Sequence, residues 1–245
     1  MPEIPPLALT GGARHPDTTG KPYPGAGAGA LHVTGDLRRQ AALAGHAKDL
    51  RRATELAAES APEVRATALG AIWRMGAFDD TWLARGLADP SAGVRRRACE
   101  LAGSAAPGSI GLLRLVSALS DTDGSVGEAA AWALGELAGA DVRPGPDVAQ
   151  MPGLAAAVEA LSAMALRHPE PLCRESAIAA LGAIGAPEGL EAVMAGTRDR
   201  PAIRRRAAVA LAAFDDPRAT LTLQGCLTDR DWQVRQAAED LLAGG

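Results

Sequence analysis

Histidine and cysteine are the side chains here that could carry nucleophilic or metal chemistry, and both are scarce. No two histidines stand four residues apart, the spacing that places two metal ligands on one helix face, and no cysteines form a C-x-x-C pair. The cysteines stand on or beside apolar positions, which favours a role in the core. The histidines are His15, His32, His46 and His168, and the cysteines are Cys99, Cys173 and Cys226. We therefore predict no catalytic residue, no metal site and no cofactor.

The charged residues are the next candidates, because arginine is concentrated in two triplets. These are Arg95–Arg97 and Arg204–Arg206, and Glu100, Glu128 and Glu175 lie between them in the chain. The chain has 25 basic and 29 acidic residues, so its net charge of −4 does not favour general binding to polyanions. A surface of mixed sign suits an acidic peptide or protein segment better than bare nucleic acid.

Helices must position these side chains, because one helical motif repeats along the chain. The stretch 87–103 reads LADPSAGVRRRACELAG: a helix ends, an Asp-Pro turn follows, and a second helix starts at Val-Arg. Six copies are separated by 30, 32, 47, 30 and 31 residues, and their apolar positions recur at offsets 0, 4, 7, 8 and 11 from the anchor. That spacing marks one face of an α-helix. The anchors are Val64, Val94, Val126, Cys173, Ile203 and Val234. We predict a stack of helical hairpins, each too small to bury its apolar face alone.

Two segments do not follow this repeat. Residues 1–34 are rich in Pro, Gly, Ala and Thr, which predicts an extended or disordered N-terminal arm before a solenoid at 35–245. Residues 139–153, GADVRPGPDVAQMPG, account for most of the 47-residue gap. We expect this insertion to be a surface loop, with a hinge between two half-solenoids or a functional loop as the alternatives.

The N-terminus and the thiols bear on location. The chain starts MPEIPPLALTGGARHP, without a basic region or a long apolar run, which predicts no signal peptide. No stretch is long and apolar enough to span a bilayer. A scattered, odd set of cysteines is typical of reduced thiols. We therefore expect a cytoplasmic protein, not bound to membranes, that is a monomer.

The repeated motif also supports a resemblance. The pattern D-P-x-x-x-V-R-x-x-A-x-x-A-L-x-x-[LI]-G resembles the HEAT-like repeat of the phycobilisome-lyase type, over roughly residues 47–245. The resemblance implies an all-α fold, a right-handed α-solenoid of about six HEAT-like helical hairpins. It also implies a binding scaffold, since the His-Glu metal ligands of the deoxyhypusine-hydroxylase relatives are absent.

The same resemblance implies a structural ladder between an Asp in each turn and the Arg of each Val-Arg pair. The ladder residues are Asp89, Arg95, Arg174, Arg204, Asp229 and Arg235. Asp89 with Arg95 and Asp229 with Arg235 match the pattern, six residues apart. We number the six copies as units one to six in chain order. Unit three, anchored at Val126, keeps Asp121 but has Gly127 in place of the arginine. We therefore expect the ladder to break there and Asp121 to lack its usual partner.

In HEAT-type units the second helices line the concave face, so offsets 2, 3 and 6 from each anchor should point into a groove. The resulting partner-binding candidates are Arg96, Arg97, Glu100, Glu128, Trp132, Arg205 and Arg206. Trp132 stands out as a large aromatic at a predicted exposed position, and Trp is enriched among binding hot spots. The alternative is that Trp132 packs across to a neighbouring helix.

Three functions are compatible with these residues. We expect a non-enzymatic scaffold or adaptor that binds a segment of a partner protein in the groove. One alternative is a nucleic-acid-binding protein similar to the HEAT-like alkylpurine DNA glycosylases, which need a cationic groove. A bilin lyase or chromophore chaperone follows only from the family name, and fold analogy does not establish function.

Overall fold

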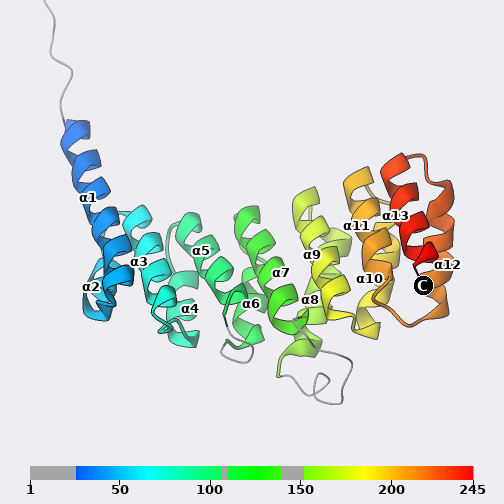
Figure 1. The fold of residues 1–245 in the computed structure, drawn as a ribbon, viewed down its shortest axis with the longest axis horizontal. Helices are drawn as coiled ribbons and strands as arrows, with labels where there is room; N and C mark the ends of the chain where they lie inside the picture. Colours follow the sequence, from blue (N-terminus) through cyan, green and yellow to red (C-terminus); the bar gives the residue numbers. More distant parts are fainter. Residues whose placement is uncertain (1–25, 106–109, 140–151, 245) are drawn as a thin grey trace, which may run out of the picture.

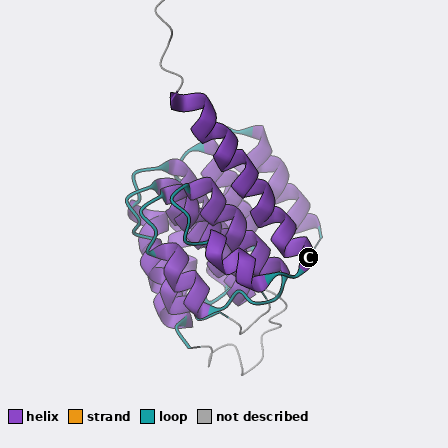
Figure 2. Ribbon diagram, turned by 90° about the vertical axis from the view of Figure 1, so that its left-hand side faces the viewer, coloured by secondary structure: helices purple, strands orange, loops and turns teal. Residues whose placement is uncertain are grey.

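The computed structural model describes residues 26–105, 110–139 and 152–244 as helices joined by short turns, and these residues contain no strand (Figures 1 and 2). After the N-terminal helix α1 (Ala26–Ala47), the helices alternate as six pairs. The first helices are α2 (Leu50–Leu56), α4 (Asp80–Leu87), α6 (Leu112–Ala118), α8 (Leu154–Arg167), α10 (Leu190–Gly196) and α12 (Pro217–Gly225). The second helices are α3 (Pro62–Arg74), α5 (Ala92–Gly103), α7 (Gly124–Gly139), α9 (Pro171–Ile184), α11 (Pro201–Leu211) and α13 (Trp232–Ala243). The prediction of an all-α solenoid is confirmed.

The pairs stack so that each kind of helix forms a layer. Each second helix packs against the second helix of the next pair, from α3 to α13, and from α4 onward each first helix packs against the next first helix. Figure 1 shows the stack running from α1 at one end to α13 at the other. The second helices form one layer and the first helices form the other. Side chains of the second helices that point away from the first helices therefore share one continuous surface, which we call the second-helix face.

Local sequence explains where the helices begin and end. Asp79 caps α4 by accepting hydrogen bonds from the N–H groups of Thr81 and Trp82. Proline occupies the first turn of α3, α9, α11 and α12, where its missing N–H costs no hydrogen bond. After α3, Gly76 has a φ of +72°, a conformation that favours glycine after the end of a helix.

One hydrophobic core runs through most of the array. It includes buried residues from Ala44 to Ala238 and joins α7 to α8 and α9 across the 140–151 segment. All six repeat anchors are at most 2% exposed. The described residues on both sides of the predicted insertion therefore share a core, as the repeat pattern indicates.

The N-terminal boundary differs from the prediction. Residues 26–34, which we assigned to the extended arm, form the first part of α1, which continues into the predicted solenoid to Ala47. The helix packs along α3, in the place of a preceding second helix. Periodicity could not reveal this start, because the alanines and glycines at 25–30 carry little side-chain pattern. Residues 1–25 of the predicted arm and 140–151 of the predicted insertion lie outside the described residues.

Candidate functional site

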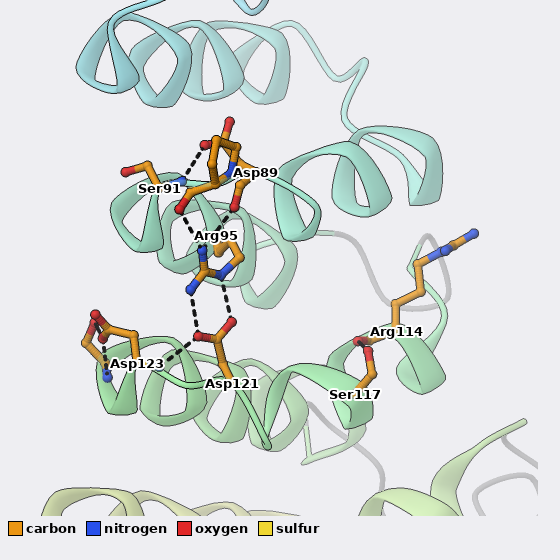
Figure 3. Close-up of polar contacts among 9 residues, drawn as sticks. Asp89, Ser91, Arg95, Arg114, Ser117, Asp121 and Asp123 are labelled. Atoms are coloured by element: carbon orange, nitrogen blue, oxygen red, sulfur yellow. Dashed lines mark hydrogen bonds and ion pairs between the residues drawn. The ribbon is translucent and has the colours of Figure 1, made fainter.

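The guanidinium group of the Val-Arg arginine links one repeat to the next, because it donates hydrogen bonds from two sides. Arg95 donates from Nη1 to the backbone carbonyls of Asp89 and Pro90 in its own turn, at 3.0 and 3.2 Å. Its Nε and Nη2 donate to the two carboxylate oxygens of Asp121 in the next unit, at 2.7 and 2.8 Å. Figure 3 shows the guanidinium between these two turns. The planar fork of arginine suits this double contact, which a lysine could not reproduce.

The same arrangement recurs along the chain, which corrects the expected pairing. Within a unit, the arginine of the Val-Arg pair contacts the backbone carbonyl of the turn residue, and its carboxylate partner belongs to the following unit. The bidentate pairs are Arg65–Asp89, Arg95–Asp121, Arg174–Asp199 and Arg204–Asp229. Asp121 therefore has a partner, contrary to the prediction. Arg235 makes the carbonyl contact, to Asp229 at 2.7 Å, and forms no ion pair with a described residue.

These pairs keep both partners charged. Hydrogen bonds from Arg95 hold the pKa of the Asp121 carboxyl below its usual value, and the carboxylate raises the pKa of the Arg95 guanidinium. Asp121 also accepts a hydrogen bond from the backbone N–H of Asp123. We call each such Arg–Asp pair a rung of the ladder. Nε, Nη1 and Nη2 of Arg95 and both carboxylate oxygens of Asp121 have partners within the fold, which supports a structural role for the pair.

The ladder is interrupted at one junction, between units three and four. Gly127 replaces the arginine, and His168 occupies the position of the carboxylate that an arginine there would meet. A Cβ built on Gly127 would lie 3.3 Å from Cε of Met164, so the methionine packs over this site. The arginine and the carboxylate are therefore both absent at this junction, so no buried charge is left there without a partner.

The groove arginines of unit two are paired within their own helix. On α5, Arg96 and Arg97 both donate to the carboxylate of Glu100, at 2.9 and 3.1 Å. Arg97 also lies against Gly70 of α3, where a Cβ would stand 3.2 Å from its Nη2. The one carboxylate offsets one of the two guanidinium charges, so these arginines are less free to attract a polyanion.

Trp132 marks the centre of a hollow on the second-helix face. One edge of its ring packs on α5, because a Cβ on Gly103 would lie 2.7 Å from Cζ3 of the indole. The residue is nevertheless 41% exposed. Trp132 thus packs on a neighbouring helix and is also partly open to solvent. The exposed part lines a cavity of about 410 Å³ between α7 and α9, a volume in the range of ligand sites.

The cavity brings together only some of the predicted groove residues. Its charged lining is Glu128, Glu136, Glu175 and Arg206. Arg96, Arg97 and Glu100 on α5 and Arg205 on α11 do not line it. The offset rule did not select Glu136, although it follows Trp132 by four residues and so lies on the same side of the helix.

The three cysteines are buried thiols. Burial raises the pKa of Cys99 to about 12 and that of Cys173 to about 11, and it also raises the pKa of Cys226. All three are therefore protonated near neutral pH and are not activated as nucleophiles. The described residues also contain no group of three or more His, Cys, Asp or Glu side chains that could hold a metal ion.

A larger cavity, of about 940 Å³, lies between α8 and the end of α9. Leu154, Val158, Leu166 and Ile184 give it an apolar wall. Its lining starts three residues after the 140–151 segment, so the described residues do not define what covers it. The smaller cavity at Trp132 is bounded by described helices on both sides and is the better candidate site.

Comparison with known proteins supports the repeat class. Residues 158–243 match the model of HEAT repeats. An engineered protein is similar over 80% of this chain and 98% of its own, with a TM-score of 0.57 and 22% identity. YibA of E. coli is similar over 90% of this chain and 83% of its own, with a TM-score of 0.60 and 17% identity. Importin beta is similar over 89% of this chain but 32% of its own, with a TM-score of 0.53 and 16% identity. No curated protein matches the sequence.

Residues 158–243 thus match HEAT repeats, and the described residues have the α-solenoid fold that the resemblance implied, while the phycobilisome-lyase type is not distinguished among such repeats. At these identities the solved structures show a common fold, and function must be argued from the site. Among the described residues, none of the helices has the length and apolar character needed to cross a bilayer.

Proposed function

We propose that this protein is a non-enzymatic scaffold that binds a segment of a partner protein on its second-helix face, in the cavity around Trp132. The observation that carries the proposal is the exposure of a tryptophan ring inside a hollow between two packed helices. A ring left partly uncovered in a concave site can bury further apolar area when a partner binds.

The position of Trp132 supports a binding role in preference to a purely structural one. Its contact with Gly103 holds one edge of the ring, so the exposed part of the ring is presented in a fixed orientation. Leu172, at the start of α9, lines the same cavity and is 60% exposed. A tryptophan held in place is typical of an interface hot spot, because little side-chain entropy is lost on binding, and Leu172 adds apolar surface on the α9 side of the cavity.

Nucleic-acid binding is less well supported by the site. Phosphate groups require unpaired cationic side chains, but Glu128, Glu136 and Glu175 outnumber the one arginine in the cavity. The arginines of unit two are already paired with Glu100. We therefore place the glycosylase-like alternative behind the scaffold, and Arg205 is an exposed arginine that remains available for it.

Selection from a random peptide display library against the whole protein tests the proposal. We expect enriched peptides whose binding falls at least tenfold in Trp132→Ala. The matched control is Trp232→Ala, which removes a 65% exposed tryptophan outside the cavity and should leave binding unchanged. Circular dichroism should show both variants folded. If the selected peptides bind Trp132→Ala as well as the parent protein, the assignment of the site is wrong.

A further inference from the structure

We infer that the segment bound at Trp132 is basic, with an Arg or Lys side chain placed over the indole, and that it also carries an aliphatic residue. The inference rests on the proposed function, and it reverses the acidic partner expected from the arginine triplets. It depends on how charges are arranged around the cavity, which the sequence pattern alone did not resolve.

Three residues of α7 form a line along the cavity. Glu128, Trp132 and Glu136 are spaced by four residues, so they lie one above the other on the same helix face, and all three line the hollow. A carboxylate therefore stands on each side of the exposed ring along the helix axis. A cation held over the ring would have an acidic group within reach in both directions.

The two flanking carboxylates have no ion-pair partner among the described residues. The neighbouring acids differ: Glu100 is paired with two arginines, and Glu175 lies 3.7 Å from Nε of Arg206. Glu128 and Glu136 take part in no such contact within the described part of the chain. The cavity therefore keeps two negative charges that a bound segment could neutralise.

The chemistry of the ring selects the same partner. The face of an indole attracts Arg and Lys cations, more strongly than other aromatic side chains do. Charge complementarity across an interface adds specificity and raises the association rate. An acidic segment would instead bring its carboxylates against Glu128 and Glu136, at a cost of like-charge contact.

The apolar part of the site sets a second requirement. Leu172 is exposed on the α9 side of the cavity, opposite the α7 line. A segment crossing from α7 to α9 would therefore place an aliphatic residue on Leu172 and its cationic residue on Trp132. We expect an Arg or Lys together with a Leu, Ile or Val in the same segment.

The composition of the selected peptides tests the inference separately from the proposed function. Trp132-dependent peptides that are enriched in Arg or Lys and that also contain aliphatic residues would support both. Trp132-dependent peptides that are acidic or neutral would retain the site and overturn the basic partner. An absence of Trp132-dependent peptides would overturn the proposed function, and the inference with it.

A charge variant then tests the mechanism with one synthetic Arg-containing peptide from the selection. We expect the double variant Glu128→Gln with Glu136→Gln to weaken binding about tenfold in 50 mM salt, and to reduce the loss of affinity that added salt causes. The matched control, Glu63→Gln with Glu239→Gln, removes two exposed charges outside the cavity and should change binding less than twofold. Equal affinity in the parent and the first double variant would overturn the role of the carboxylates.

Discussion

Two junctions of this solenoid show different ways to join one repeat to the next. Between units two and three, Arg95 joins two turns and Gly103 lets α5 and α7 approach closely. Between units three and four the arginine rung is missing, and α7 and α9 meet through two glycines. A Cβ on Gly135 would lie 3.0 Å from Cα of Ala180, and one on Gly139 would lie 2.7 Å from the carbonyl oxygen of Ala183.

The glycine contact and the arginine pair are therefore independent ways of joining two units. Glycines at offset 9 meet alanines at offset 7 of the next unit in three successive junctions, and only two of these also carry an arginine rung. The contacts are Gly103–Ala133, Gly135–Ala180 and Gly182–Ala210. Close backbone approach therefore holds the helices together where the ladder is absent, so the missing rung does not by itself create a hinge.

The largest effect is expected where only the glycine contact is present. Gly135→Val should lower the free energy of unfolding by about 3 kcal/mol, because its side chain would force α7 away from the backbone of Ala180. The measurement is urea unfolding followed by far-ultraviolet circular dichroism. Gly35→Val is the matched control in exposed α1, where nothing lies within 4 Å, and it should change stability by less than about 0.5 kcal/mol. Equal effects of the two variants would contradict close packing at this junction.

A smaller effect is expected from removing one rung of the ladder. Arg95→Ala should lower the free energy of unfolding by about 2 kcal/mol, because it leaves the largely buried carboxylate of Asp121 and two carbonyl groups without their donor. The adjacent exposed residue supplies the control, and Arg96→Ala should cost less than about 0.5 kcal/mol. Removing Asp121 as well should recover part of the loss. Similar costs for Arg95→Ala and Arg96→Ala would show that the rung adds nothing beyond a surface pair.

The smallest effect is the pH dependence of the ladder. The arginines hold the pKa values of Asp121, Asp199 and Asp229 below their usual range, so the folded state keeps these groups ionised more readily than the unfolded chain does. The stabilisation is therefore complete above the unfolded pKa of about 3.9 and is lost as the pH falls below it. Urea unfolding between about pH 5 and about pH 3 should show a decrease that is smaller in the double variant Arg95→Ala with Asp121→Ala. If stability falls with pH as much in that variant as in the parent protein, the Arg95–Asp121 pair does not contribute to the pH dependence.

The pairing error shows where reasoning from the sequence stops. Asp89 and Arg95 are six residues apart and do touch, but through the backbone carbonyl of Asp89. The carboxylate that Arg95 binds is 26 residues further on, in Asp121. A repeating sequence shows equal spacing in every unit, so spacing cannot tell a partner in the same turn from one in the next.

The proposed binding site was predicted only in part for a similar reason. Periodicity placed Trp132 on the second-helix face and predicted its exposure. It also placed Arg96 and Arg97 on that face, but it could not show that Glu100 pairs with both. It did not select Glu136, because the lining of a cavity depends on how whole helices pack.

Local patterns in the sequence were enough to predict the class of fold, the six repeats and their anchors, because helix periodicity and turn residues act over a few neighbouring positions. The structure was needed to show which unit supplies each carboxylate, that α1 starts at Ala26, and that the free charge beside Trp132 is negative. These features depend on contacts between helices that are distant in the chain. Their geometry follows from the packing of whole units rather than from any local pattern.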